Sequence, residues 1–335
     1  MNMRKWLEDV KSSKEKKAMP VLSFPAVSLM GITVKELISD SDLQAKAMKT
    51  VADRTDSLAS VSLMDLSLEA EAFGATISVS DDEVPTVVGA LVTSGEEADA
   101  LKVPDVRDGR CGIYIDAIKK AKELICDRPV LAGVIGPFSL AGRLMDVSEA
   151  MINCYADPDM VHTTLKKCTE FLIKYINEYK KAGANGVVMA EPLAGMLSPA
   201  LADEFSSVYV KEIADAVQDD DFILVYHNCG DNVILMIDSI ISTNSAAYHF
   251  GDSIKLSEML THIPSDIITM GNVSPSRQFK GGTPESMKQE TKEIMAECIK
   301  YPNFVISSGC DIPPSSPWAN IDAFFEAVSE FYKEN

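Results

Sequence analysis

The chain has no long hydrophobic run and no excess of positive charge. None of its apolar runs reaches 18 residues, which predicts that no helix spans a membrane. The N-terminal segment MNMRKWLEDVKSSKEKK is basic but lacks the apolar core of a signal peptide. The formal net charge of -19 argues against nucleic acid or an anionic membrane surface as the main partner. We therefore expect an acidic cytoplasmic protein.

The chain also has no CxxC pair, although it has seven cysteines. An odd, widely spaced set in a large chain without a signal peptide indicates free thiols in a reducing compartment. We expect most of them to be buried, because free cysteine is among the residues most often buried. They are Cys111, Cys126, Cys154, Cys168, Cys229, Cys298 and Cys310.

What is present is a series of short apolar runs bounded by turn residues, which predict strands. These runs are Val21 to Phe24, Ala59 to Leu63, Val130 to Ile135, Gly186 to Met189, Phe222 to Tyr226, Ala247 to Phe250, Ile267 to Met270 and Phe304 to Ser307. Segments with helical spacing separate most of them. Continuously apolar strands that alternate with helices are typical of a parallel sheet covered on both faces. The pattern predicts an α/β fold with a single (β/α)8 TIM barrel.

The length of 335 residues allows two ordinary domains or one large barrel, and the strand pattern favours one domain over residues 1–335. An N-terminal helical extension is expected over about residues 1–18. The stretch from about Ser67 to Leu101 does not follow the alternation, and it predicts an insertion or an irregular hairpin.

Two helix boundaries can be read from single residues. Thr283 can cap a helix whose first position is Pro284, and Glu285 then lies at the positive end of the helix dipole. Gly183 is a natural stop for the helix expected over Pro158 to Ala182.

A histidine and a cysteine end one predicted strand in FILVYHNCGD. Residues i and i+2 of a strand point to one side, so His227 and Cys229 are expected to face the same way. The carboxyl ends of barrel strands form the active face, where this pair would lie. By itself an HxC pattern is more often packing than a metal site.

Two further strand ends strengthen the prediction of a metal site. Cys310 follows the last predicted strand, and Glu191 follows the strand at Gly186 to Met189. One histidine, two cysteines and a displaceable oxygen ligand suit catalytic zinc. The alternatives are that Cys310 is a buried thiol and that Glu191 is a helix cap or an ion-pair partner. His249 in AYHFGD is a further candidate, for a substrate contact.

Zinc at such a site could activate either a thiol or a water molecule. It lowers the pKa of a bound thiol and so generates a nucleophile at neutral pH. Two protein thiolates already donate charge to the metal, which weakens it as a Lewis acid for water. Thiol alkylation is therefore the better fit.

Four segments carry a resemblance to a known family. They are GPFSLAGRLMD from Gly136, the long segment from Asp157 to Gly195, GNVSP from Gly271 and GCDIPPSSPWANIDAF from Gly309. The chain resembles the uroporphyrinogen decarboxylase superfamily, and within it the zinc-dependent methylcobamide:coenzyme M methyltransferases. The resemblance covers nearly the whole chain from about Met19 onward and implies a (β/α)8 barrel.

The two branches of this superfamily differ in the residues that carry chemistry. The decarboxylases have an Arg-rich motif near the N-terminus for substrate carboxylates, whereas this chain has no arginine between Arg4 and Arg54. The resemblance to the methyltransferases places zinc ligands at His227, Cys229 and Cys310. It implies that a methylated corrinoid carried by a partner protein gives its methyl group to a zinc-bound thiol.

The resemblance leaves the thiol and its contacts open. Coenzyme M, homocysteine or another acceptor could serve. Arg143, Asn272 and Ser274 are candidates for binding the cofactor or the substrate, and ordinary loop or surface roles are the alternative. A metal-free lyase and a corrinoid- or metal-binding protein without catalysis remain as rival functions.

Overall fold

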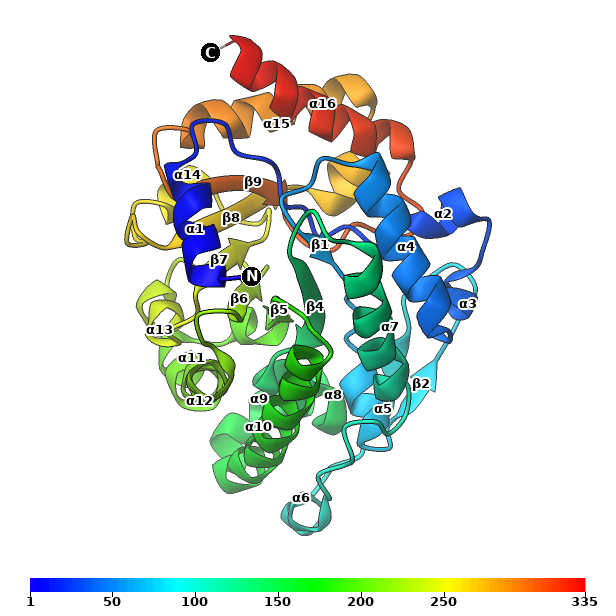
Figure 1. Cartoon of the computed structure of the whole chain (residues 1–335). Helices are drawn as coiled ribbons and strands as arrows, with labels where there is room; N and C mark the ends of the chain where they lie inside the picture. The colour runs from blue at the N-terminus through cyan, green and yellow to red at the C-terminus, as the bar shows by residue number, and fades with distance from the viewer. Residues whose placement is uncertain (335) are drawn as a thin grey trace.

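The computed structural model describes residues 1–334, and its centre is a parallel sheet that curls on itself inside a layer of helices (Figure 1). The strand order is β1-β4-β5-β6-β7-β8-β9. These strands are β1 Ser60–Val61, β4 Val130–Ile135, β5 Gly186–Ala190, β6 Ile223–Asn228, β7 Ala247–Phe250, β8 Ile268–Val273 and β9 Phe304–Ser308. Neighbours pair in parallel, as the sequence predicts for strands separated by helices.

The helices cover the outside of the sheet and one of its ends (Figure 1). The α-helices are α1 Met3–Ser12, α2 Ala26–Met30, α3 Val34–Ile38, α4 Ser41–Arg54, α5 Leu68–Ala72, α6 Gly95–Ala100, α7 Cys111–Leu124, α8 Pro137–Met145, α9 Val147–Ala156, α10 Pro158–Lys181, α11 Pro199–Ala202, α12 Val208–Val217, α13 Ile237–Ser242, α14 Leu256–Met259, α15 Pro284–Cys298 and α16 Trp318–Glu334. Shorter helical turns are η1 Pro192–Met196, η2 Asp203–Ser207 and η3 Pro275–Lys280.

The predicted eighth strand, Val21 to Phe24, is not formed, so a complete eight-stranded barrel is not confirmed. The segment just before it, at Ala18 and Met19, lies between the edge strands β1 and β9 and forms isolated hydrogen bonds there. Leu58 N donates to Ala18 O at 2.8 Å, and Met19 N donates to Ile306 O at 3.0 Å. Pro20 has no N–H to donate, which interrupts a ladder at this point.

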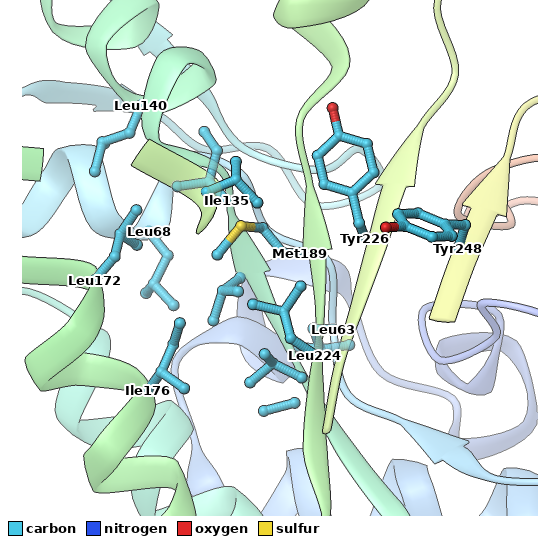
Figure 2. Packing of buried hydrophobic residues seen from close by; sticks show 14 of the residues in the cluster. Leu63, Leu68, Ile135, Leu140, Leu172, Ile176, Met189, Leu224, Tyr226 and Tyr248 are labelled. Carbon is cyan, nitrogen blue, oxygen red and sulfur yellow. The ribbon is translucent and has the colours of Figure 1, made fainter. Parts of the chain in front are cut away.

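Alternate residues of the strands face two different cores. Val188, Val225 and Val305 belong to a cluster inside the curl, whereas Met189 and Leu224 belong to the larger cluster under the helices. Figure 2 shows the larger cluster, in which Leu172 and Ile176 of α10 face Met189 and Leu224. This alternation fixes which strand residues can point into the curl.

The predicted N-terminal extension contains α1, and this helix packs against the inner cluster. Met3 is fully buried there together with Val10, and Met3 N donates to Asp220 O at 2.7 Å, just before β6. Helix α1 therefore covers the amino ends of the strands, and the carboxyl ends remain for the polar residues that follow each strand.

The local predictions at turns and helix ends are confirmed. Thr283 caps α15 in a capping box with Ser286. Gly183 follows α10 with φ +99°, a conformation that favours glycine. Within the stretch that interrupts the alternation, β2 Thr76–Ser78 and β3 Thr86–Val88 form an antiparallel hairpin. Over residues 1–334, none of the helices has the length and apolar character needed to cross a membrane.

Candidate metal centre

Strand β6 carries a histidine into the interior of the curl. Ile223 and Val225 belong to the inner cluster, and His227 continues this alternation at the end of the strand. His227 is 2% exposed. Cys229 lies two residues further, and both side chains line one cavity of about 60 Å³. The spacing of two residues thus brings both side chains to the same cavity.

Cys310 reaches the same cavity from the loop after β9. Donor atoms of His227, Cys229 and Cys310 all lie within 4.8 Å of one another. Donors that bind zinc tetrahedrally at about 2.0–2.1 Å for nitrogen and about 2.3 Å for sulfur lie roughly 3.5 Å apart. The distance from His227 Nε2 to Cys310 Sγ is 3.4 Å. This donor set fits zinc in both chemistry and spacing.

The pKa values of the two thiols shift in opposite directions. The hydrogen bond from Cys310 and the neighbouring His227 lower the pKa of the Cys229 thiol to about 4. The same hydrogen bond, with burial, raises the pKa of Cys310. Cys229 is therefore a thiolate at neutral pH, which is the form that binds a metal.

His249 lies behind His227 and fixes its tautomer. Ser307 Oγ donates its proton to Met19 O at 2.7 Å, so it accepts from His249 Nε2, also at 2.7 Å. Burial lowers the pKa of His249, so the ring is neutral and its Nδ1 accepts from His227 Nδ1 at 2.7 Å. With Nδ1 donating in this way, Nε2 is the ring nitrogen of His227 that would bind a metal on the side of the thiols. His249 itself is 1% exposed and does not line the cavity, so it meets His227 rather than open space for a substrate.

The structure does not bring Glu191 into the group of three ligands. The residue follows Val187 and Met189 in the alternation, which puts it on the helix side of β5. Its Oε1 accepts from Ser139 N of α8 at 3.0 Å, while Oε2 has no partner. Burial raises its pKa to about 8. Glu191 was expected to face the same way as the metal ligands, and this expectation is wrong because the alternation along β5 turns its side chain to the helix side. Its bond to Ser139 N matches the alternative of a helix cap.

Asn272 lies near the end of β8 and Ser274 directly follows this strand, and neither side chain lines this cavity. Asn272 Nδ2 donates to Gly251 O at 2.9 Å and to Ile254 O at 2.8 Å. Ser274 caps η3 by accepting from Arg277 N. Both side chains are engaged in holding loops, which was the alternative to a binding role.

Arg143, the third of these candidates, lines a cavity that adjoins the one at the metal ligands. It is carried by α8 and lines a cavity of about 220 Å³. That cavity and the one at the metal ligands share Met64 and Leu66. Asp311 was not among the predicted site residues, yet it lines the metal cavity beside Cys310 and has a buried Oδ1 without a partner. Its position directly after Cys310 in GCDIPP is the signal that could have indicated it.

Comparison with known proteins identifies the family of this chain. The family model for uroporphyrinogen decarboxylase (URO-D) matches residues 16–331. The chain belongs to the uroporphyrinogen decarboxylase family. The match covers the sheet, the helices from α2 to most of α16, and all three candidate zinc ligands, and it leaves out α1.

Relatives in both branches of this family are similar to the chain. A methylcobamide:CoM methyltransferase MtbA of Methanosarcina acetivorans is 26% identical over 274 residues, covering 80% of this chain and 78% of that protein. A uroporphyrinogen decarboxylase of Flavobacterium johnsoniae is 27% identical over 292 residues, covering 82% and 80%. A solved methyltransferase from Methanosarcina mazei has 24% identity and a TM-score of 0.87, covering 99% of this chain and 98% of that one, which shows a shared fold. Overall sequence identity does not distinguish the methyltransferases from the decarboxylases as relatives of this chain, so the residues of the site have to distinguish them.

Proposed function

We propose that this chain is a corrinoid-dependent methyltransferase that uses zinc to activate a thiol, such as coenzyme M. The observation that carries the proposal is the convergence of His227, Cys229 and Cys310 within 4.8 Å in one cavity. The relatives named as methylcobamide:CoM methyltransferases support the corrinoid as methyl donor. The proposal includes a partner protein that carries the methylated corrinoid.

In this proposal His227, Cys229 and Cys310 hold zinc, and the acceptor thiol takes the remaining position. Zinc, when bound, would lower the pKa of that thiol so that it is a thiolate at neutral pH. Apolar side chains of Val21, Leu66 and other residues line the cavity, which limits the access of water. His249 and Ser307 hold the His227 ring in its metal-binding tautomer.

The transfer is balanced in atoms and charge. The cobalt–carbon bond of the methylated corrinoid breaks heterolytically, and a sulfur–carbon bond forms on the acceptor. The thiol proton goes to solvent, and the corrinoid leaves as its cob(I) form. The thiolates of Cys229 and Cys310 add negative charge to the site, which favours a nucleophilic thiolate over the activation of water.

The test is zinc content and methyl transfer in wild type and matched cysteine variants. We expect about one zinc per chain in wild type, and loss of both zinc and methylcobalamin demethylation in Cys229→Ser and Cys310→Ala. Exposed Cys126 lies outside the ligand group, so Cys126→Ser should retain both. Full activity in Cys310→Ala, or in wild type freed of zinc by a chelator, would refute the proposal.

The same preparation distinguishes the rival functions. A metal-free lyase would bind a polycarboxylate porphyrinogen without zinc. A binding protein without catalysis would bind zinc and corrinoid but leave the methyl group in place when thiols are supplied. Arg143 is the single cationic side chain, among the described residues, that lines either of the two adjoining cavities, which disfavours a substrate with several carboxylates.

A further inference from the structure

Arg143 differs from the other arginines of this chain in having no acidic partner. The sequence has seven arginines and 50 acidic residues, and all seven arginines lie within the described part of the chain. Six of them form ion pairs, namely Arg4, Arg54, Arg107, Arg110, Arg128 and Arg277. Among residues 1–334, no side chain or backbone oxygen bonds to the Arg143 guanidinium. In a chain with net charge -19, an arginine left unpaired in this way needs an explanation.

The place of Arg143 indicates what its partner would be. Its side chain is partly buried, and burial without a compensating carboxylate lowers its pKa. It lines a cavity of about 220 Å³ together with Ser67, Thr86 and apolar residues, and no acidic side chain lines that cavity. A partly desolvated guanidinium facing such a cavity gains most from an anion that supplies two acceptor oxygens.

The cavity adjoins the candidate metal centre. Met64 and Leu66 line both this cavity and the one that contains His227, Cys229 and Cys310. A small molecule with one end at the thiols and the other at Arg143 would have to pass these two side chains. The volume suits a short chain and an acid group, and it is too small for a whole tetrapyrrole.

We propose that Arg143 binds the acid group of the acceptor thiol and thereby selects small thiols that carry a sulfonate or a carboxylate. The thiol part of this inference rests on the proposed function, whereas the anion site does not. The hairpin of β2 and β3, which supplies Thr86 to the cavity, covers the acid end of the ligand.

The test compares thiols of similar size but different charge. Zinc-loaded wild type, Arg143→Gln, Arg143→Lys and Arg4→Gln are titrated calorimetrically with 2-mercaptoethanesulfonate, 3-mercaptopropionate and 2-mercaptoethanol. Arg4 is an exposed surface arginine and provides the control. We expect Arg143→Gln to weaken binding of the two anionic thiols by about tenfold or more. Binding of neutral 2-mercaptoethanol should be unchanged, and Arg143→Lys should recover part of the loss. The better of the two anionic thiols identifies the acid group.

A second arm reads the anion site without thiol chemistry. Binding of ethanesulfonate to the protein without zinc is followed by ligand-observed NMR, and it should be present in wild type and absent in Arg143→Gln.

If this holds while no thiol is methylated, the anion site stands and the proposed function fails. If Arg143→Gln binds all three thiols as wild type does, the inference about Arg143 is overturned. Methylcobinamide differs from methylcobalamin in lacking the phosphodiester. If Arg143→Gln instead loses binding of methylcobalamin but keeps binding of methylcobinamide, the anion that Arg143 binds belongs to the corrinoid, and the assignment to the thiol is wrong. Zinc content and thermal unfolding of each variant show that it is folded.

Discussion

At the scale of single residues, the site depends on which ring nitrogen of His227 carries the proton. The bonds from His227 Nδ1 to His249 Nδ1 and from His249 Nε2 to Ser307 Oγ determine this. Such partners behind a ligand orient the ring and raise its basicity. His249 is therefore a positioning residue, although it never reaches the cavity.

This role predicts the effect of removing the His249 ring. His249→Ala leaves His227 Nδ1 with only the longer contact to the backbone oxygen of residue 249, at 3.3 Å, so the tautomer with a free Nε2 is less favoured. We expect zinc affinity to fall by about 10- to 100-fold, measured by competition with a chromophoric chelator. His262 is exposed, and His262→Ala should bind zinc as wild type does. Unchanged affinity in His249→Ala would exclude the positioning role.

At the scale of elements, α1 is part of the structure rather than a loose extension. It lies across the amino ends of the strands (Figure 1), with Met3 and Val10 buried against the inner cluster. This cluster supports the strands whose opposite ends carry the metal ligands. Packing at one end of the sheet thus determines the order of residues at the other.

Truncation of Met3 should therefore destabilise the whole sheet. We expect Met3→Ala to lower the free energy of unfolding by about 2–5 kcal/mol, since it opens a cavity in a closed core. Lys5→Ala, on the exposed side of the same helix, should change it by less than about 0.5 kcal/mol. Denaturant unfolding followed by circular dichroism measures both. Equal, small effects would mean that α1 is not needed for the fold.

At the scale of the whole molecule, buried carboxyl groups make stability depend on pH. Glu69 is 1% exposed, and burial raises its pKa to about 8. Its Oε1 accepts from Ile135 N at 3.1 Å, and its Oε2 has no partner. Because the folded protein holds this proton more tightly than the unfolded chain, the stabilisation is complete below the ordinary carboxyl pKa. It is lost as pH rises through about 8.

The pH dependence should flatten when this group cannot ionise. We expect the free energy of unfolding of wild type to fall between pH 5 and pH 8, and that of Glu69→Gln to fall less. The two decreases should differ by more than about 1 kcal/mol. Glutamine keeps the acceptor for Ile135 N. Denaturant midpoints across this range provide the measurement, with exposed Glu96→Gln as the control. Parallel curves for Glu69→Gln and wild type would contradict the shifted pKa.

Much of the fold and part of the site followed from local signals. Period and turn residues predicted Val130–Ile135 and Ala247–Phe250 with their correct bounds, and Thr283 and Gly183 marked helix ends. The family resemblance is confirmed by the family model and by its relatives. These features depend on residues close in sequence, or on motifs read directly from it.

Tertiary structure decided the features that depend on direction and on distant partners. Glu191 directly follows β5, whereas His227 lies within β6 and pairs with Ala190. This difference of one position turns Glu191 to the helix side, and the end of a strand cannot be fixed to one residue from sequence. The hydrogen bonds of His249 join residues far apart in the chain. That Arg143 lacks a carboxylate, and that its cavity adjoins the metal ligands, is a property of packing alone. The sequence by itself thus determined the elements and the ligand types, and only the folded chain decided which side chains meet.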